Sequence, residues 1–283
     1  MDTVPYAFRT AVIATLGKPF IIGENFSSKL WRRAAEKETQ HRVDCELKLH
    51  YQNGLWDYSI RMLQNHIFVG LSFEEFKNLN RRHVRFTIVK IGSPCAASIH
   101  SLFEEIKAIV RYTRPCVNMS RLSLTSTSNC PQNDLLELLS MYEDSYFYEI
   151  DTHGTAHRTL DFLLPHLKSK LLASLCVNER VCSAKLKTKF KEVALNERYK
   201  FFRVLTKTTF DLDFFESLIQ KPAPHGDYCI LHSSNVELSH FKNMRKELQI
   251  VDHGEDFKRW RRADRIEVSV SKFGNRLHFM FFK

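Results

Sequence analysis

Residues 146–178 read YFYEIDTHGTAHRTLDFLLPHLKSKLLASLCVN, and this stretch decides how the chain is expected to fold. It begins with a short apolar run, continues through an amphipathic stretch at 156–168, and ends in a second apolar run. That order is typical of a strand, a helix and a second strand. Because parallel neighbours in a sheet need a crossover connection, the helix between the two runs predicts that these strands are parallel.

The same order recurs on both sides of this stretch. Successive candidate strands start 27, 25, 28, 29 and 21 residues apart. Their first residues are Met119, Tyr146, Leu171, Tyr199, Tyr228 and Gln249. Helical patterns lie between them, at 133–142, 156–168, 183–196, 211–220 and 234–248. We therefore expect a stack of strand–helix units, which favours a binding scaffold over an enzyme fold without repeats.

The residues before the repeats predict helices and a hairpin. Helical patterns lie at 4–16 and 27–38, and alternation on both sides of Asn53-Gly54 predicts a hairpin. The pairs Ser72 with Glu75 and Ser101 with Glu104 have the spacing of capping boxes, and the chain closes with a second hairpin at 266–282. We expect an α/β fold in three parts: a helical module at 1–40, a hairpin-containing connector at 41–115, and a repeat domain at 116–283. The repeat domain would be leucine-rich-repeat-like or an open, mostly parallel sheet.

Composition narrows the class of protein. The 283 residues are 43% hydrophobic and 26% charged, as in folded domains. Only 9 glycines occur, and no G-x-G pattern is present, so we expect no loop that cradles phosphates and no cofactor. The seven cysteines lack C-x-x-C pairs, which indicates a reducing compartment, the cytoplasm or the nucleus. No apolar run is long enough to span a bilayer, so we expect no membrane partner.

Candidate catalytic and metal-binding patterns are weak. No G-x-S-x-G elbow occurs, and the acidic pairs at 74–75 and 104–105 fall where helices begin, which explains them as capping residues. His153 and His157 are four residues apart, but no acidic residue follows His153 as it does in a metalloprotease helix. The sequence therefore predicts no catalytic residues and no metal site.

A second informative pattern lies at the N-terminus. Apolar residues recur every four positions after a proline, and a tryptophan follows in the basic stretch KLWRRAA at 29–35. The residues that carry this pattern are Val4, Pro5, Phe8, Val12, Leu16 and Trp31. The segment resembles an F-box, whose motif begins Leu-Pro, continues with apolar positions at four-residue steps and contains a Trp in a basic context. Ala7 stands where the family usually has an acidic residue, and residues 23–25 weaken the second helix.

The F-box resemblance implies a function. It implies that the six residues form or support a surface that binds the adaptor subunit of a cullin–RING ubiquitin ligase, as a helix in a groove does. The remainder of the chain is similar in layout to the F-box-associated regions of nematode receptor families. The chain would then be a non-catalytic receptor that recruits an unknown target protein. A structural scaffold that keeps only a relic of the F-box is an alternative.

A cluster of basic residues suggests another alternative. The net charge is +10 and the pI is about 9.2. Five cations surround Trp260, and these are Lys258, Arg259, Arg261, Arg262 and Arg265. Cations contact phosphates and an aromatic ring stacks on a base, so the cluster is a candidate polyanion site and the chain a candidate nucleic-acid-binding protein. Trp260 is equally explained as a core residue.

Overall fold

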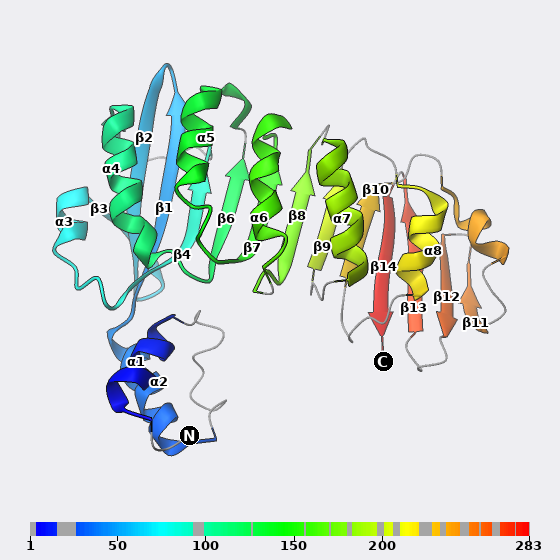
Figure 1. The fold of residues 1–283 in the computed structure, drawn as a ribbon, viewed down its shortest axis with the longest axis horizontal. Helices are drawn as coiled ribbons and strands as arrows, with labels where there is room; N and C mark the ends of the chain where they lie inside the picture. Colours follow the sequence, from blue (N-terminus) through cyan, green and yellow to red (C-terminus); the bar gives the residue numbers. More distant parts are fainter. Residues whose placement is uncertain are drawn as a thin grey trace. The chain divides into compact units, whose positions relative to one another are not determined.

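The computed structural model describes residues 4–15, 27–92, 99–125, 127–155, 157–169, 171–179, 183–196, 201–205, 210–220, 228–232, 236–243, 249–254, 256–261, 267–274 and 276–282. The chain forms two compact units, Met1–Tyr148 and Glu149–Lys283, and each combines a sheet with helices (Figure 1). A mixed α/β fold with many parallel strand pairs is therefore confirmed. The finer division at residues 40 and 115 stays a prediction.

The first unit begins with two helices and continues with a sheet. Its helices are α1 (Tyr6–Thr15), α2 (Lys29–His41), α3 (Phe73–Lys77), α4 (Phe103–Thr113), α5 (Gln132–Ser140) and the 3₁₀ turns η3 (Arg114–Cys116) and η4 (Thr127–Asn129). Its strands are β1 (Val43–Gln52), β2 (Leu55–Gln64), β3 (Ile67–Leu71), β4 (Val84–Ile91), β5 (Ile99–Ser101) and β6 (Ser120–Thr125).

The sheet of the first unit has the strand order β6-β4-β1-β2-β3, and β5 also pairs with β2. The pairs β1–β4 and β4–β6 are parallel, whereas β1–β2 is the predicted hairpin. Its turn residues Asn53 and Gly54 have φ values of 54° and 85°. Two successive left-handed residues are the requirement of a type I′ turn, whose twist matches the strands, so Asn53-Gly54 sets the register.

The two faces of this sheet differ in chemistry. Helices α4 and α5 cover one face (Figure 1), where the alternating residues of β1, β2, β4 and β6 are apolar. The buried members are Cys45, Leu47, Leu49, Ile60, Val89, Ile91, Leu122 and Leu124. The other face carries no described α-helix and is charged, with Glu46 and Lys48 on β1, Arg61 on β2 and Lys90 on β4. Arg61 and Lys90 form ion pairs with the buried Glu46 carboxylate on this face.

The second unit contains the most regular repeats. Its strands are β7 (Phe147–His153), which begins at the last residues of the first unit, β8 (Ser174–Asn178), β9 (Phe201–Leu205), β10 (Tyr228–His232), β11 (Gln249–His253), β12 (Phe257–Arg261), β13 (Glu267–Phe273) and β14 (Arg276–Phe282). Its helices are α6 (Leu163–His166), α7 (Ala184–Asn196), α8 (Leu212–Gln220) and the 3₁₀ turns η5 (His157–Phe162) and η6 (Leu238–Asn243).

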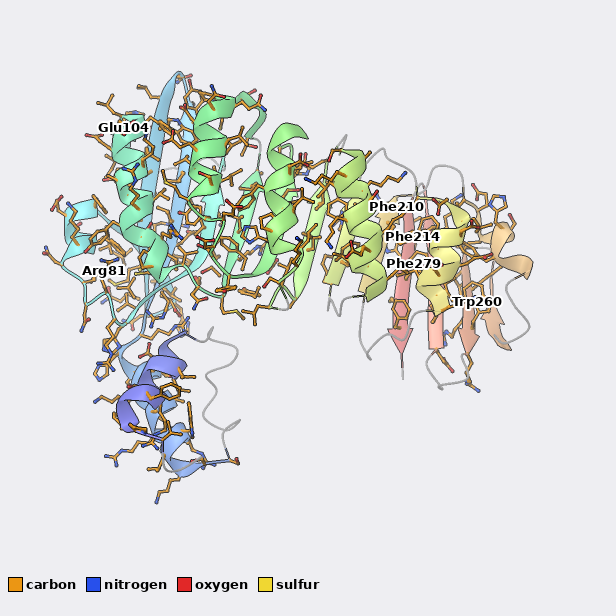
Figure 2. The ribbon with its side chains drawn as sticks, in the orientation of Figure 1. Arg81, Glu104, Phe210, Phe214, Trp260 and Phe279 are labelled. Carbon is orange, nitrogen blue, oxygen red and sulfur yellow. The ribbon has the colours of Figure 1, made fainter. Side chains whose placement is uncertain are left out.

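The strand order of the second unit is β7-β8-β9-β10-β14-β13-β12-β11. The first four strands are parallel, as the strand–helix spacing predicts, and the remaining pairs are antiparallel. Helices α7 and α8 lie on one face (Figure 1), and aromatic rings of α8 contact one another and β14. Phe215 stacks on Phe279 of β14 with ring centroids 5.6 Å apart, and Phe210 stacks on Phe214 at 4.9 Å (Figure 2).

Three predicted elements are wrong in part. The helix expected at 156–168 is mostly the 3₁₀ turn η5, because Pro165 has no N–H to donate and prevents one continuous α-helix. In the helix expected at 234–248, the described residues form only η6. The strand at Gln249 is antiparallel to β12 and does not continue the parallel series.

Of the two capping boxes predicted at helix starts, one is confirmed and the other is wrong. The Ser72 side chain accepts from the Glu75 N–H at 3.2 Å while Glu75 accepts from the Ser72 N–H at 2.7 Å, as predicted. At α4 the capping residue is Leu102, whose N–H donates to Glu105 Oε2 at 3.0 Å. Ser101 belongs to β5, so the predicted box with Glu104 is wrong by one position.

No helix among the described residues is long and apolar enough to cross a membrane.

Candidate functional site

The two N-terminal helices pack on each other through a small core of their own. Ile13 of α1 and Ala34 and Ala35 of α2 are fully buried, and Trp31 packs against them. Two alanines side by side let the helix backbones approach closely, and the tryptophan covers the remaining apolar surface. Trp31 therefore helps to hold the two helices together.

Polar residues attach the helix pair to the sheet of the same unit. The Arg82 guanidinium donates to Thr10 Oγ1 at 3.1 Å. Glu38 of α2 is buried, and its carboxylate lies 3.3 Å from His83 Nδ1 and 3.6 Å from Arg85. A buried carboxylate needs such partners, because burial of an unpaired charge is costly. The side of α1 and α2 that faces the sheet is therefore polar.

As a result, Phe8 of α1 lies on the side of the helix that is not buried. Phe8 is 57% exposed, whereas the next two residues, Arg9 and Thr10, are only 5% and 6% exposed. Pro5 is exposed, and Val12, one turn after Phe8, is half-buried on the same side. An ordinary amphipathic helix that packs on its own domain has the opposite arrangement. Of the residues in this stripe, Pro5 and Phe8 are therefore exposed to solvent.

The other predicted residues of this surface have different positions. Val4, just before α1, is half-buried, and Leu16 lies outside the described residues. Two exposed residues were missed by the sequence prediction, Tyr6 of α1 and Leu30 of α2. Leu30 had a signal: it lies about 100° around the helix from Trp31, at the border of the buried side.

A groove adjoins this exposed surface. It has a volume of about 590 Å³, and its lining residues are Tyr6, Leu30, Arg33, Glu36, Lys37, Gln40 and His41. The Lys37 ammonium lies 5.8 Å from the centre of the Tyr6 ring, within the range of a cation–π contact. The helix pair thus combines exposed apolar residues with a groove that is mostly basic at its rim.

The basic cluster of the second unit has a different character. Trp260 is buried on β12 (Figure 2) and packs edge-on against Phe241 with ring centroids 6.1 Å apart. Arg261 is paired with Glu267 at 2.6 Å, and Arg262 and Arg265 lie outside the described residues. Because successive strand residues point to opposite faces, Lys258 shares a face with Trp260 while Arg259 and Arg261 share the other. These cations do not surround an accessible ring.

A substitution at Trp260 tests this placement. Trp260→Ala should lower the free energy of unfolding by about 3–5 kcal/mol, because removal of a buried tryptophan leaves a cavity between η6 and the sheet. Urea unfolding followed by circular dichroism measures the change. Phe273→Ala, at a 61% exposed ring in the last residue of β13, is the control with little expected effect. A loss below 1 kcal/mol for Trp260→Ala would show that the ring is not a core residue.

The described cysteines are poorly suited to nucleophilic chemistry. Burial, with a smaller contribution from nearby carboxylates, raises the pKa of Cys45 and of Cys176 to about 12 and that of Cys130 to about 11. Burial also raises the pKa of Cys116. At neutral pH these thiols are protonated, and the thiol is not the reactive form. In the part of the chain that the structure describes, no cluster of His, Cys, Asp and Glu could hold a metal ion.

Comparison with known proteins does not assign the chain to a family. No protein-family model matches the chain, and no curated protein matches it. The geometry of α1 and α2 and the physical chemistry of the exposed surfaces are therefore the basis for inferring a function.

Proposed function

We propose that the chain is a non-catalytic receptor that binds the adaptor subunit of a cullin–RING ubiquitin ligase through α1 and α2 and recruits a target protein through the rest of the chain. The observation that carries this proposal is the orientation of α1, with Phe8 exposed while Arg9 and Thr10 are buried. The F-box resemblance of residues 4–35 says which partner such a surface would bind.

The energetics favour a protein partner for this surface. Full burial of a phenylalanine side chain contributes roughly 1.5–3 kcal/mol. More than half of Phe8 is exposed in the free chain, so more than half of this free energy is still to be gained when a partner covers the ring. Pro5 and Val12 extend the apolar surface beside it. Aromatic anchors of this kind are typical of the residues that dominate binding energy at interfaces.

The basic residues of α2 favour a partner with an acidic surface. Lys29, Arg33 and Lys37 are exposed on α2, and two of them line the groove beside Tyr6. An adaptor surface that places acidic residues opposite these cations would associate faster and in one orientation. Binding should therefore weaken as the salt concentration rises, mainly through slower association.

A direct titration tests the proposal. The purified full-length chain is titrated with the purified adaptor subunit by isothermal calorimetry at several temperatures and at low and moderate salt. We expect one-to-one binding with a negative heat-capacity change, because apolar surface is buried. If no binding is measured at protein concentrations of about 100 μM, the helix pair is a relic and the proposal is wrong.

Nucleic-acid binding is not supported by a specific observation. Its stacking residue, Trp260, is buried, and Arg261 already pairs with Glu267. Only the net charge therefore supports nucleic-acid binding, and a net charge of +10 permits many other acidic partners.

A further inference from the structure

A different surface of the first unit, the outer edge of β3, has the features of a peptide-binding site. β3 is last in the strand order of its sheet, and among the described strands only β2 pairs with it (Figure 1). Three successive residues are exposed, Ile67 by 68%, Phe68 by 39% and Val69 by 42%. An apolar edge strand of this kind is unusual, because an unpaired edge attracts other strands.

The register of the β2–β3 hairpin shows which backbone groups face outward. Gln64 pairs with Ile67 across the two-residue turn Asn65-His66, whose φ values are 50° and 66°. The pair that flanks such a turn exchanges its hydrogen bonds, and the pairs then alternate along the hairpin. Ile67, Val69 and Leu71 therefore direct their backbone groups to β2. Phe68 and Gly70 direct theirs away from the sheet, and no described backbone group bonds to them there.

The edge lacks the devices that protect other sheet edges. β3 contains no charged residue, no proline and no bulge in its pairing with β2. The outer strand of the second unit, β11, has a register irregularity between Ile250 and Asp252 and carries a charged residue there. Because proteins commonly guard edges in these ways, the unguarded edge of β3 points to use as a binding surface.

We propose that the outer edge of β3 binds a short, extended, apolar segment of a partner protein as an additional strand. The outward N–H and C=O groups of Phe68 and Gly70 would pair with its backbone, and Ile67 and Val69 would pack against alternate apolar side chains. A Cβ placed on Gly70 would meet no atom within 4 Å, so a bulky side chain of the segment fits opposite this glycine.

The size of the edge favours a segment over a second copy of this chain. β3 has five residues, about 17 Å of strand, and β5 already occupies the adjoining part of the β2 edge. Stable protein–protein interfaces bury roughly 1,200–2,000 Å², which a pairing of two such edges does not supply by itself. A short peptide segment needs no more than this edge. The inference does not depend on adaptor binding, which uses α1 and α2.

Two substitutions at Gly70 form a matched pair. Gly70→Pro removes the outward N–H while the internal pairing of Val69 and Leu71 with β2 is kept, as proline is tolerated on the open side of edge strands. Gly70→Ala keeps the N–H, enters open space, and replaces a glycine whose φ is not left-handed. The two variants differ in the hydrogen bond that the proposal requires.

The probe is a phage-displayed library of random dodecapeptides selected on the immobilised full-length chain. We expect enriched peptides with alternating apolar residues, bound equally by the wild type and Gly70→Ala and at least ten-fold more weakly by Gly70→Pro. In a second measurement on the wild-type chain alone, N-methylation of the peptide amides that face β3 should cause a similar loss, so the test remains valid if Gly70→Pro fails to fold.

Three results would overturn the inference. The first is the enrichment of no peptide, and the second is equal binding by the wild type, Gly70→Pro and N-methylated peptides. The third is self-association of the wild type in analytical ultracentrifugation that Gly70→Pro abolishes, since the occupant would then be a second copy. Calorimetry with the adaptor should be unchanged for both Gly70 variants, which separates this inference from the proposed function.

Discussion

Phe8→Asp should weaken binding of the adaptor subunit by about 100-fold, or about 2.7 kcal/mol, in the calorimetric titration. The substitution removes the aromatic anchor and places a charge in an apolar interface. The fold should survive, because Phe8 is 57% exposed and the new carboxylate lies in the first turn of α1, where the helix dipole favours a negative charge. The free energy of unfolding should change by less than about 0.5 kcal/mol.

Two variants control this experiment. Phe273→Asp makes the same change at a ring that is 61% exposed in the other unit, and it should leave adaptor binding unchanged. Phe8→Leu keeps an apolar side chain on the stripe and should retain most of the affinity. Equal affinity of wild type and Phe8→Asp would show that the stripe of α1 does not contact the adaptor.

Glu46→Gln should lower the free energy of unfolding of the first unit by about 3–5 kcal/mol. The Glu46 carboxylate is buried on the charged face of the sheet and binds the Arg61 guanidinium, whose Nε donates at 2.8 Å, and the Lys90 ammonium at 2.7 Å. Lys48 lies 3.9 Å from the same carboxylate. Without the negative charge, three cations remain close together over neighbouring strands. Glu74→Gln, which removes an exposed pair with Lys77, should cost at most about 0.5 kcal/mol.

The same carboxylate should make stability depend on pH. Burial by itself raises the pKa of Glu46, but hydrogen bonds from Lys90 and Arg61 and the charges of nearby lysines outweigh it and hold the pKa below its ordinary value of 4.5. A lowered pKa in the folded state means that the contribution is complete above pH 4.5 and is lost as the pH falls through the folded value. Urea unfolding at pH 7 and at pH 3 should show a smaller loss for Glu46→Gln than for the wild type. Equal losses would exclude Glu46 as a source of the pH dependence.

Local signals in the sequence predict local structure well in this chain. Asn53-Gly54 predicts the β1–β2 hairpin because both residues tolerate positive φ, and Ser72 predicts the start of α3 because its hydroxyl reaches the Glu75 N–H. The spacing of apolar runs predicts the parallel strands from β7 to β10. Phe8 is 57% exposed, but whether it belongs to an adaptor-binding surface stays a prediction.

Features that depend on distant residues were not predictable. Glu38 is buried in α2 only because His83 and Arg85 lie beside it, and the sequence separates them by more than forty residues. The sequence of β12 suggests a basic cluster, because cations flank Trp260. It does not show that this tryptophan is buried. The direction of β11 and the open edge of β3 follow from the order in which strands pair, which apolar periodicity does not contain.

The central claim is that the apolar stripe of α1 contacts the adaptor. A photo-crosslinking phenylalanine analogue at position 8 tests it most directly, with the same analogue at position 273 as the control. The account predicts that irradiation links the adaptor covalently to position 8 and not to position 273. A complex with the adaptor that forms without any link from position 8 would contradict the claim.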